Sequence, residues 1–279
     1  MKYAKYLVAI AAFVTLALVG FSAFTTVPEK AAETAAPAIQ NCLATREAAR
    51  NEFPFMVVID VPGHGQGYGI LISPEFVLTT AALVNNSTTI KLGFGVHNLT
   101  DYATGQGDET AAVQVVVNAA NTVTLHTGWS PGSLADNLAI IQLPSPVALS
   151  AAIQPLTSVN ESQNYWAGQS IQSIGWGLYL ENGAVRVTPT PQVVDVSTVA
   201  MPVAISTLGK AYDQASHVAA NAPGATSTTS VLVTTGTGGT QLLGLLNESI
   251  PGGGMAVYTR LDHAATATWV SQNTGVVFN

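Results

Sequence analysis

The chain has 279 residues, of which 48% are hydrophobic and only 9% are charged, and its formal net charge is −7. This is enough apolar material for one large all-β domain or two small ones. The acidic balance and the scarcity of lysine and arginine argue against nucleic acid as a partner.

The N-terminus has the layout of a secretory signal. Lys2 and Lys5 precede an uninterrupted apolar run, Leu7–Gly20, and small residues follow up to Ala23. This order of basic, apolar and small residues predicts a signal peptide over residues 1–23, and hence a secreted, extracellular protein. An uncleaved membrane anchor is the alternative, because the apolar stretch extends a few residues further and then approaches the length that spans a bilayer.

Residues 24–46 are mostly Ala, Thr, Pro and Glu without apolar periodicity, which predicts a flexible, propeptide-like leader. Order is expected to begin near Phe53, within a single domain over residues 47–279. Cys42 is the one cysteine, so no intrachain disulfide can form. Its thiol is either tolerated in the leader or forms an intermolecular bridge.

Five N-x-S/T sequons support passage through the secretory pathway and predict a glycoprotein. The candidate acceptors are Asn85, Asn86, Asn98, Asn160 and Asn247.

Short β-rich runs between turn clusters predict an all-β sandwich or barrel. In chain order the runs are Phe55–Val61, Gly69–Ser73, Phe76–Thr79, Thr89–Phe94, Ala112–Val117, Leu138–Leu143, Ser170–Gly175, Val193–Val199, Val231–Thr235 and Leu242–Leu246. The exception is Leu261–Ser271, whose pattern predicts a C-terminal helix capped by Asp262. No repeat of 20 to 50 residues is present, which disfavours solenoids and propellers.

Several short blocks of sequence between about Cys42 and Gly275 are informative when they are taken together. They are Leu71–Thr79 (LISPEFVLT), Gly93–Asn98 (GFGVHN), His126–Trp129 with Leu138–Leu143, Ile153–Leu156 (IQPL), Gly175–Gly177 (GWG), Gly244–Leu246 and Val257–Arg260 (VYTR). In order and spacing these blocks resemble the trypsin/chymotrypsin-like serine proteases. The resemblance implies two six-stranded antiparallel Greek-key β-barrels with a C-terminal α-helix.

The same resemblance implies that the catalytic triad is missing. A protease of this type needs a hydroxyl nucleophile, an imidazole base and a carboxylate that orients the imidazole. The matching positions are Ala82, which has no proton affinity, Asn137, whose amide cannot balance an imidazolium charge, and Thr228. Asp136 is adjacent to Asn137, but in an extended strand its side chain is expected to face the opposite way.

The supporting parts of a protease site are also substituted. No glycine surrounds Thr228, which disfavours an oxyanion hole. Segment Cys42–Thr45 matches the position at which an activated family member has its free N-terminus. In the family that amine pairs with an aspartate, and Ser227 is at the matching position here. Three further positions match those that form the specificity pocket in the family, namely Ala222, Ser249 and Ala256. The usual disulfide beside the histidine is absent, with Gly67 and Leu83 at its two positions. The alignment of the loop from Asn221 to Ser230 remains open.

A relocated triad would need another imidazole. The histidines are His64, His97, His126, His217 and His263, and Ser227 or Ser230 could supply a hydroxyl. His97 and His126 are expected in surface loops. The histidines lack the HExxH spacing of a zinc enzyme, so no metal or cofactor is expected.

Three functions follow from these observations. The favoured one is a secreted serine protease homologue (a pseudoprotease) that is not an enzyme and that binds extracellular proteins, namely proteases or protease inhibitors. The second is a structural or luminal bulk protein of a secreted matrix or gut fluid, a role that suits the low content of charged residues in this chain. The third is residual endopeptidase activity from a relocated site.

Overall fold

The computed structural model describes residues 45–105, 112–158, 171–181, 184–209, 212–213, 215–221, 231–236, 239–249 and 255–278. They belong to one compact unit, Asn41–Asn279. The predicted signal peptide, Cys42, Asn160, Ala222, Thr228 and the segment 222–230 lie outside the described residues. Within the described part, no helix is long and apolar enough to cross a membrane.

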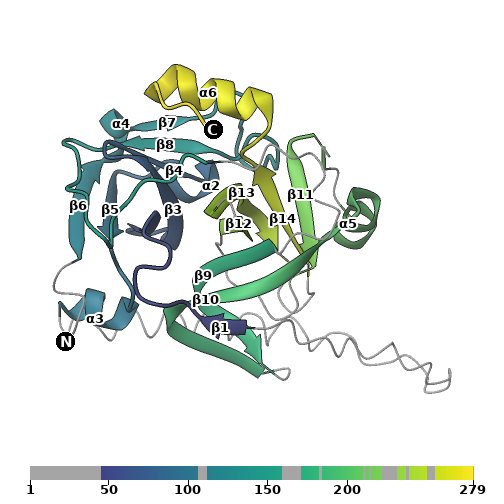
Figure 1. The fold of residues 1–279 in the computed structure, drawn as a ribbon. Coiled ribbons are helices and arrows are strands. Elements are labelled where there is room, and N and C mark those ends of the chain that lie inside the picture. Colours follow the sequence, from purple (N-terminus) through teal and green to yellow (C-terminus); the bar gives the residue numbers. More distant parts are fainter. Residues whose placement is uncertain are drawn as a thin grey trace. The chain divides into compact units, whose positions relative to one another are not determined.

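The first sheet has seven antiparallel strands in the order β6-β5-β2-β3-β4-β8-β7 (Figure 1). Its strands are β2 (Met56–Val61), β3 (Gly65–Ser73), β4 (Phe76–Thr79), β5 (Thr89–Phe94), β6 (Val113–Asn118), β7 (Val123–Leu125) and β8 (Ala139–Gln142). Alternation explains the buried face: Ile90, Leu92 and Phe94 of β5 are buried, whereas Thr89 and Lys91 are only partly covered. Three short helices connect the strands: α2 (Ala81–Val84), α3 (Leu99–Thr104) and α4 (Ala119–Thr122).

The second sheet closes into a barrel. Its order is β1-β10-β11-β14-β13-β12-β9, and an additional β10–β9 pairing joins the last six into a ring, with β1 as an extra edge strand. Its strands are β1 (Thr45–Glu47), β9 (Ile171–Glu181), β10 (Ala184–Val199), β11 (His217–Asn221), β12 (Val231–Gly236), β13 (Gly239–Ser249) and β14 (Met255–Arg260). Two helices follow strands of this sheet, α5 (Met201–Leu208) after β10 and α6 (Ala264–Thr274) after β14.

One apolar cluster contains residues of both sheets. Tyr68 of β3 packs against Trp176 of β9, with ring centroids 5.0 Å apart and an interplanar angle of 34°. Trp176 is 3% exposed, and its indole N–H donates to the carbonyl oxygen of His97 at 2.9 Å. Val270 of α6 belongs to the same cluster. The two sheets therefore share a core in addition to their separate ones.

The all-β class and the C-terminal helix are confirmed, and each of the ten predicted runs overlaps a strand. Each sheet has seven strands rather than six, because β1 and the three-residue β7 add to the edges. Order begins before Phe53, since β1 pairs with β10 through Arg46 opposite Val193. This pairing places part of the predicted leader within the sheet.

The predicted cap of the C-terminal helix is wrong. Helix α6 begins at Ala264 with His263 at its N-cap, and no side chain caps it. Asp262 instead accepts hydrogen bonds from the Arg260 guanidinium, with Nε to Oδ1 at 2.9 Å. The Asp262 carboxylate therefore pairs with Arg260 and does not accept from the backbone N–H groups of the helix.

Candidate functional site

Ala82 and Asn137 lie in contact where the first sheet meets the second. Ala82 is exposed on α2, directly after β4, and Asn137 is 4% exposed, two residues before β8. The Ala82 backbone N–H donates to Asn137 Oδ1 at 2.9 Å. Register explains the proximity, because β4 and β8 are neighbours and pair Thr79 with Ala139.

Asn137 also reaches the second sheet. Its Nδ2 donates to Asn247 Oδ1, on β13, at 2.9 Å. Asn247 Nδ2 donates in turn to the Leu134 carbonyl oxygen and lies 3.2 Å from His217 Nε2, on β11. We call this chain, from Ala82 through Asn137 and Asn247 to His217, the amide bridge.

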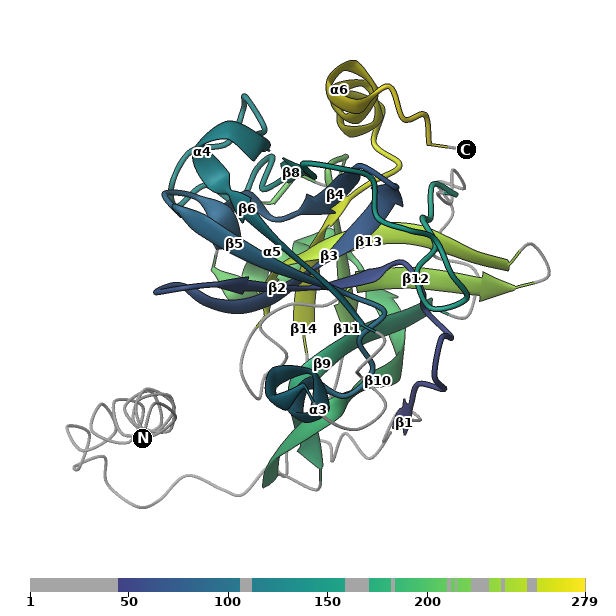
Figure 2. The ribbon, with the colours of Figure 1, turned by 90° about the vertical axis from the view of Figure 1, so that its left-hand side faces the viewer.

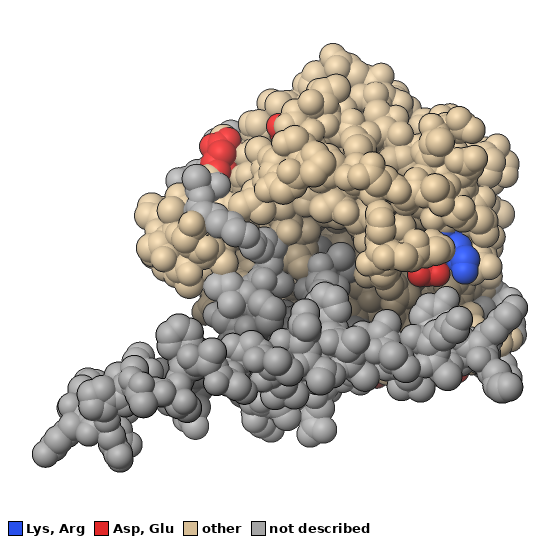
Figure 3. All heavy atoms as spheres, turned by 180° about the vertical axis from the view of Figure 1, so that it is seen from behind, with Lys and Arg blue, Asp and Glu red and all other residues tan. Residues whose placement is uncertain are grey.

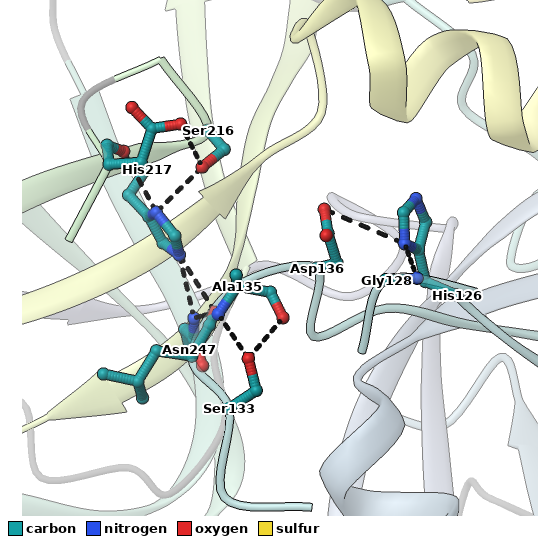
Figure 4. A network of polar contacts seen from close by, with 10 residues as sticks. His126, Gly128, Ser133, Ala135, Asp136, Ser216, His217 and Asn247 are labelled. Atoms are coloured by element: carbon teal, nitrogen blue, oxygen red, sulfur yellow. Dashed lines mark hydrogen bonds and ion pairs between the residues drawn. The ribbon is translucent and has the colours of Figure 1, made fainter. Parts of the chain in front are cut away.

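His217 has a backbone carbonyl oxygen beside each ring nitrogen. The side chain is 3% exposed, and Nδ1 lies 3.0 Å from the Asp213 carbonyl oxygen while Nε2 lies 3.0 Å from the Leu134 carbonyl oxygen. Both oxygens can only accept, so either tautomer of the imidazole donates to one of them. His217 is therefore a structural member of the bridge, and Figure 4 shows its contact with Asn247.

Ser216 and His217 place a hydroxyl and an imidazole together, with Ser216 Oγ 3.1 Å from Nδ1. The hydroxyl also lies 3.0 Å from Asp213 Oδ2, to which it donates. Backbone donation from Ala215 and the Ser216 hydroxyl hold the pKa of Asp213 below its usual value, so this acceptor is ionised at neutral pH. The Ser216 hydroxyl thus directs its proton to the Asp213 carboxylate rather than to the imidazole, and both Ser216 and His217 are buried. The geometry suits anchoring of the loop rather than nucleophilic catalysis.

Asp136 does not have the extended conformation expected from the sequence. Its φ is 54°, in the left-handed region that Asp tolerates, and the strand begins only at Ala139. Its carboxylate lies 3.8 Å from His126 Nδ1, which also accepts from the Gly128 N–H at 3.2 Å (Figure 4). The His126 side chain is 12% exposed and its ring lies 4.7 Å from that of Trp269, so it is not the surface histidine that was expected.

This environment predicts a pH dependence of stability. Burial lowers the pKa of His126, and the nearby Asp136 charge opposes that shift only in part. Because the unfolded chain then binds a proton more readily than the folded one, stability should be full above the ordinary pKa of 6.5 and should fall as the pH drops through it. Urea unfolding between pH 7.5 and 5.5 measures the effect.

A His126→Gln variant is the control for this pH dependence. It should show a flatter profile over the same range, because Glu52 and Asp213, whose pKa values are lowered, titrate at lower pH. An equal slope in the variant and the natural chain would show that His126 is not the titrating group.

The other expected site residues are only partly brought together. Ser249 and Ala256 are cross-strand partners on β13 and β14, and Ala256 is buried, whereas Ala222 and Thr228 lie outside the described residues. His64 Nδ1 is 3.4 Å from the Leu83 carbonyl oxygen, and His97 Nε2 is 3.4 Å from Glu47 Oε1. Within the described part of the chain, no three His, Cys, Asp or Glu residues lie close enough to hold a metal.

The described sequons differ in their availability. Asn86 is exposed and has a φ of 57°, and Asn85 precedes it at the end of α2. Asn98 caps α3, its Oδ1 accepting from Thr100 N at 2.9 Å. Asn247 uses Nδ2, the atom that a glycan would modify, as a donor inside the amide bridge, so glycosylation there is incompatible with this fold.

Comparisons with known proteins are consistent with this architecture. A family model described as Trypsin matches residues 43–230. Brachyurin of Leptuca pugilator is 29% identical over 150 residues, 54% of this chain and 61% of that protein. Chymotrypsin-C of Rattus norvegicus is 31% identical over 159 residues, 53% of this chain and 56% of that protein. The chain thus spans between half and two thirds of the length of the curated relatives that it matches.

A solved structure titled "Structure of GrC" has the same fold. It superposes with a TM-score of 0.67 and covers 83% of this chain and 98% of its own, at 17% sequence identity. At that identity the likeness concerns the fold alone.

Proposed function

This chain belongs to the trypsin family of serine proteases, and on that premise we propose that it is a secreted member that binds other extracellular proteins and does not hydrolyse peptides. Its binding partners would be proteases or protease inhibitors. The observation on which the proposal depends is the contact between Ala82 and Asn137.

Ala82 matches the family's histidine, and its contact with Asn137 supports that alignment. In the family the histidine and the carboxylate are neighbours, and here the two substituted residues are neighbours across the junction of β4 and β8. A methyl group cannot accept a proton from a nucleophile. Loss of the base alone reduces kcat in a serine protease by a factor on the order of 10⁶.

The partners of Asn137 support the same proposal. Both of its amide atoms have uncharged hydrogen-bonding partners, Ala82 N–H and Asn247 Oδ1. In an active enzyme this position must hold a carboxylate that stabilises an imidazolium. Uncharged partners at this position suit a site that no longer develops charge.

Peptide turnover tests the catalytic part of the proposal. The purified chain, assayed with chromogenic peptides having basic, aromatic or small residues before the scissile bond, should give rates equal to buffer. If turnover is found, Thr228→Ala serves as the control, because activity that survives this change does not come from the aligned nucleophile. Turnover that copurifies with the chain and is lost in Thr228→Ala would overturn the proposal.

Affinity capture from the native fluid tests the binding part. Immobilised chain should retain a protease or an inhibitor, and the Asn121→Leu variant, whose exposed substitution lies outside the amide bridge, should retain it equally well. Recovery of neither class of protein would contradict the binding role while leaving the catalytic assay intact.

A durable bulk protein of a protease-rich fluid is the second candidate, and the positions of Lys91 and Arg260 favour it. Lys91 lies in β5, between β2 and β6, and Arg260 lies in β14 with its guanidinium bound to Asp262. Backbone held in a sheet cannot enter a protease cleft without local unfolding. Charged side chains are also few among the described residues on the face seen in Figure 3. Native trypsin digestion as fast as that of an ordinary globular control would exclude this role.

A further inference from the structure

Strand β6 is an edge strand of unusual composition. It pairs with β5 along its whole length, and among the described residues no other strand pairs with it. It lies at the margin of the first sheet in Figure 1, and Figure 2 brings this side to the front. Its free edge is a template for another strand.

The usual protections of an edge are missing from β6. Its sequence, VQVVVN, contains no charged residue and no proline, and Val116 is 54% exposed. The nearest described residues, from Ala112 to Ala135, include no Lys, Arg, Asp or Glu. Edge strands of soluble proteins are normally blunted by lysine, by proline or by a bulge. An edge of this composition is suited to an uncharged strand.

The pattern of β6 complements itself in one antiparallel register. Alternation places Val113, Val115 and Val117 on the inner face and Gln114, Val116 and Asn118 on the outer face. With a two-fold axis at Val116, the outer face pairs Val116 with its own copy and Gln114 with Asn118. The inner face then pairs Val115 with Val117. Every opposite pair matches in polarity, as stable cross-strand pairs do.

Among the described residues of this sheet, the charge opposite the two-fold axis does not oppose this pairing. That charge belongs to Lys91, opposite Val116 on β5, where its Nζ lies 3.7 Å from Asp60 Oδ2. In the paired sheet, two copies of Lys91 would be separated by three strand spacings, about 14 Å. That separation exceeds the screening length of about 8 Å at physiological ionic strength.

We propose that β6 is a self-association surface, at which two copies of this chain pair antiparallel through residues Gln114–Asn118 to form a two-fold symmetric dimer. One five-residue strand pair is a small interface of the transient class, so the dissociation constant should be on the order of 10 µM. The dimer joins the first sheets of two copies and leaves the amide bridge untouched.

Sedimentation equilibrium tests the proposal with the chain and two variants. The natural chain should change from one to two chain masses between roughly 1 and 100 µM, the concentrations that bracket the expected constant. Val116→Lys places two like charges at the two-fold axis and should weaken association at least tenfold. Val203→Lys, on exposed α5 at 49% exposure, is the matched control and should dimerise like the natural chain.

Hydrogen exchange locates the contact. Backbone amides within residues 114–118 should gain protection with rising concentration in the natural chain, and not in Val116→Lys. The proposal is overturned by a chain that stays monomeric at 100 µM, by a dimer that Val116→Lys leaves intact, or by open-ended assembly. Circular dichroism of each variant confirms that a lost dimer does not reflect a lost fold.

Discussion

Asn137→Leu should lower the free energy of unfolding by about 2 to 3 kcal/mol, since leucine has a similar size but no hydrogen-bonding atoms. The substitution leaves Asn247 Oδ1 without its donor and the Ala82 N–H without its acceptor. Urea unfolding at pH 7 measures the loss. Asn121→Leu, at an exposed position of α4, should change the stability by less than about 0.5 kcal/mol.

Asn137→Asp separates the charge from the hydrogen bonds at the same position. One carboxylate oxygen can still accept from Ala82 N–H, but the other faces Asn247 Oδ1, which is also an acceptor. Burial without a countercharge raises a carboxyl pKa, so the variant should be destabilised at pH 7 and should recover as the pH falls toward 4. A variant as stable as the natural chain at pH 7 would mean that this position still accommodates the carboxylate of an active protease.

Trp176→Ala should have the largest effect on stability, about 3 to 5 kcal/mol, because it empties a buried indole site between the two sheets. The indole is 3% exposed, packs on Tyr68 at 5.0 Å, and donates to the His97 carbonyl oxygen. The loss should appear as a lower urea midpoint with an unchanged slope, if both sheets unfold together.

Trp176→Phe separates the contribution of ring packing from that of the indole hydrogen bond. It keeps a ring beside Tyr68 and removes the hydrogen bond to His97, so a smaller loss of about 1 to 2 kcal/mol is expected. Val277→Ala, at a position 61% exposed, is a control expected to be nearly neutral. A Trp176→Ala variant that loses less than about 1 kcal/mol would show that this contact does not hold the shared core together.

Strand alternation and the order of the sequence blocks were sufficient to predict most of the fold. The elements that were missed lack those signals. Strand β11, His217–Asn221, is small and almost fully buried, so no polar residues alternate with apolar ones. Helix α5 combines Val, Ile and Thr with a proline in its first turn, a composition that does not stand out as helical.

The residues of the candidate site that lie next to the matched sequence blocks could be predicted, whereas those that come from distant parts of the chain could not. Ala82 and Asn137 follow strands that the sequence identifies. The partners Asn247 and His217 come from positions 110 and 80 residues further along the chain than Asn137, and no pattern of residue types links them. Asn247 was interpreted as a sequon, although its place directly after the Gly244–Leu246 block was a signal that it lies at the junction. Asp136 was assigned to a strand because the left-handed turn before β8 leaves no mark in the sequence.

Reaction with a fluorophosphonate, followed by intact-mass measurement, tests the absence of an activated nucleophile most directly. Such reagents form a covalent bond with a hydroxyl only when a neighbouring base removes its proton. We expect no mass increase under conditions that label active trypsin completely. A single adduct per chain on a serine or threonine, absent after heat denaturation, would contradict it.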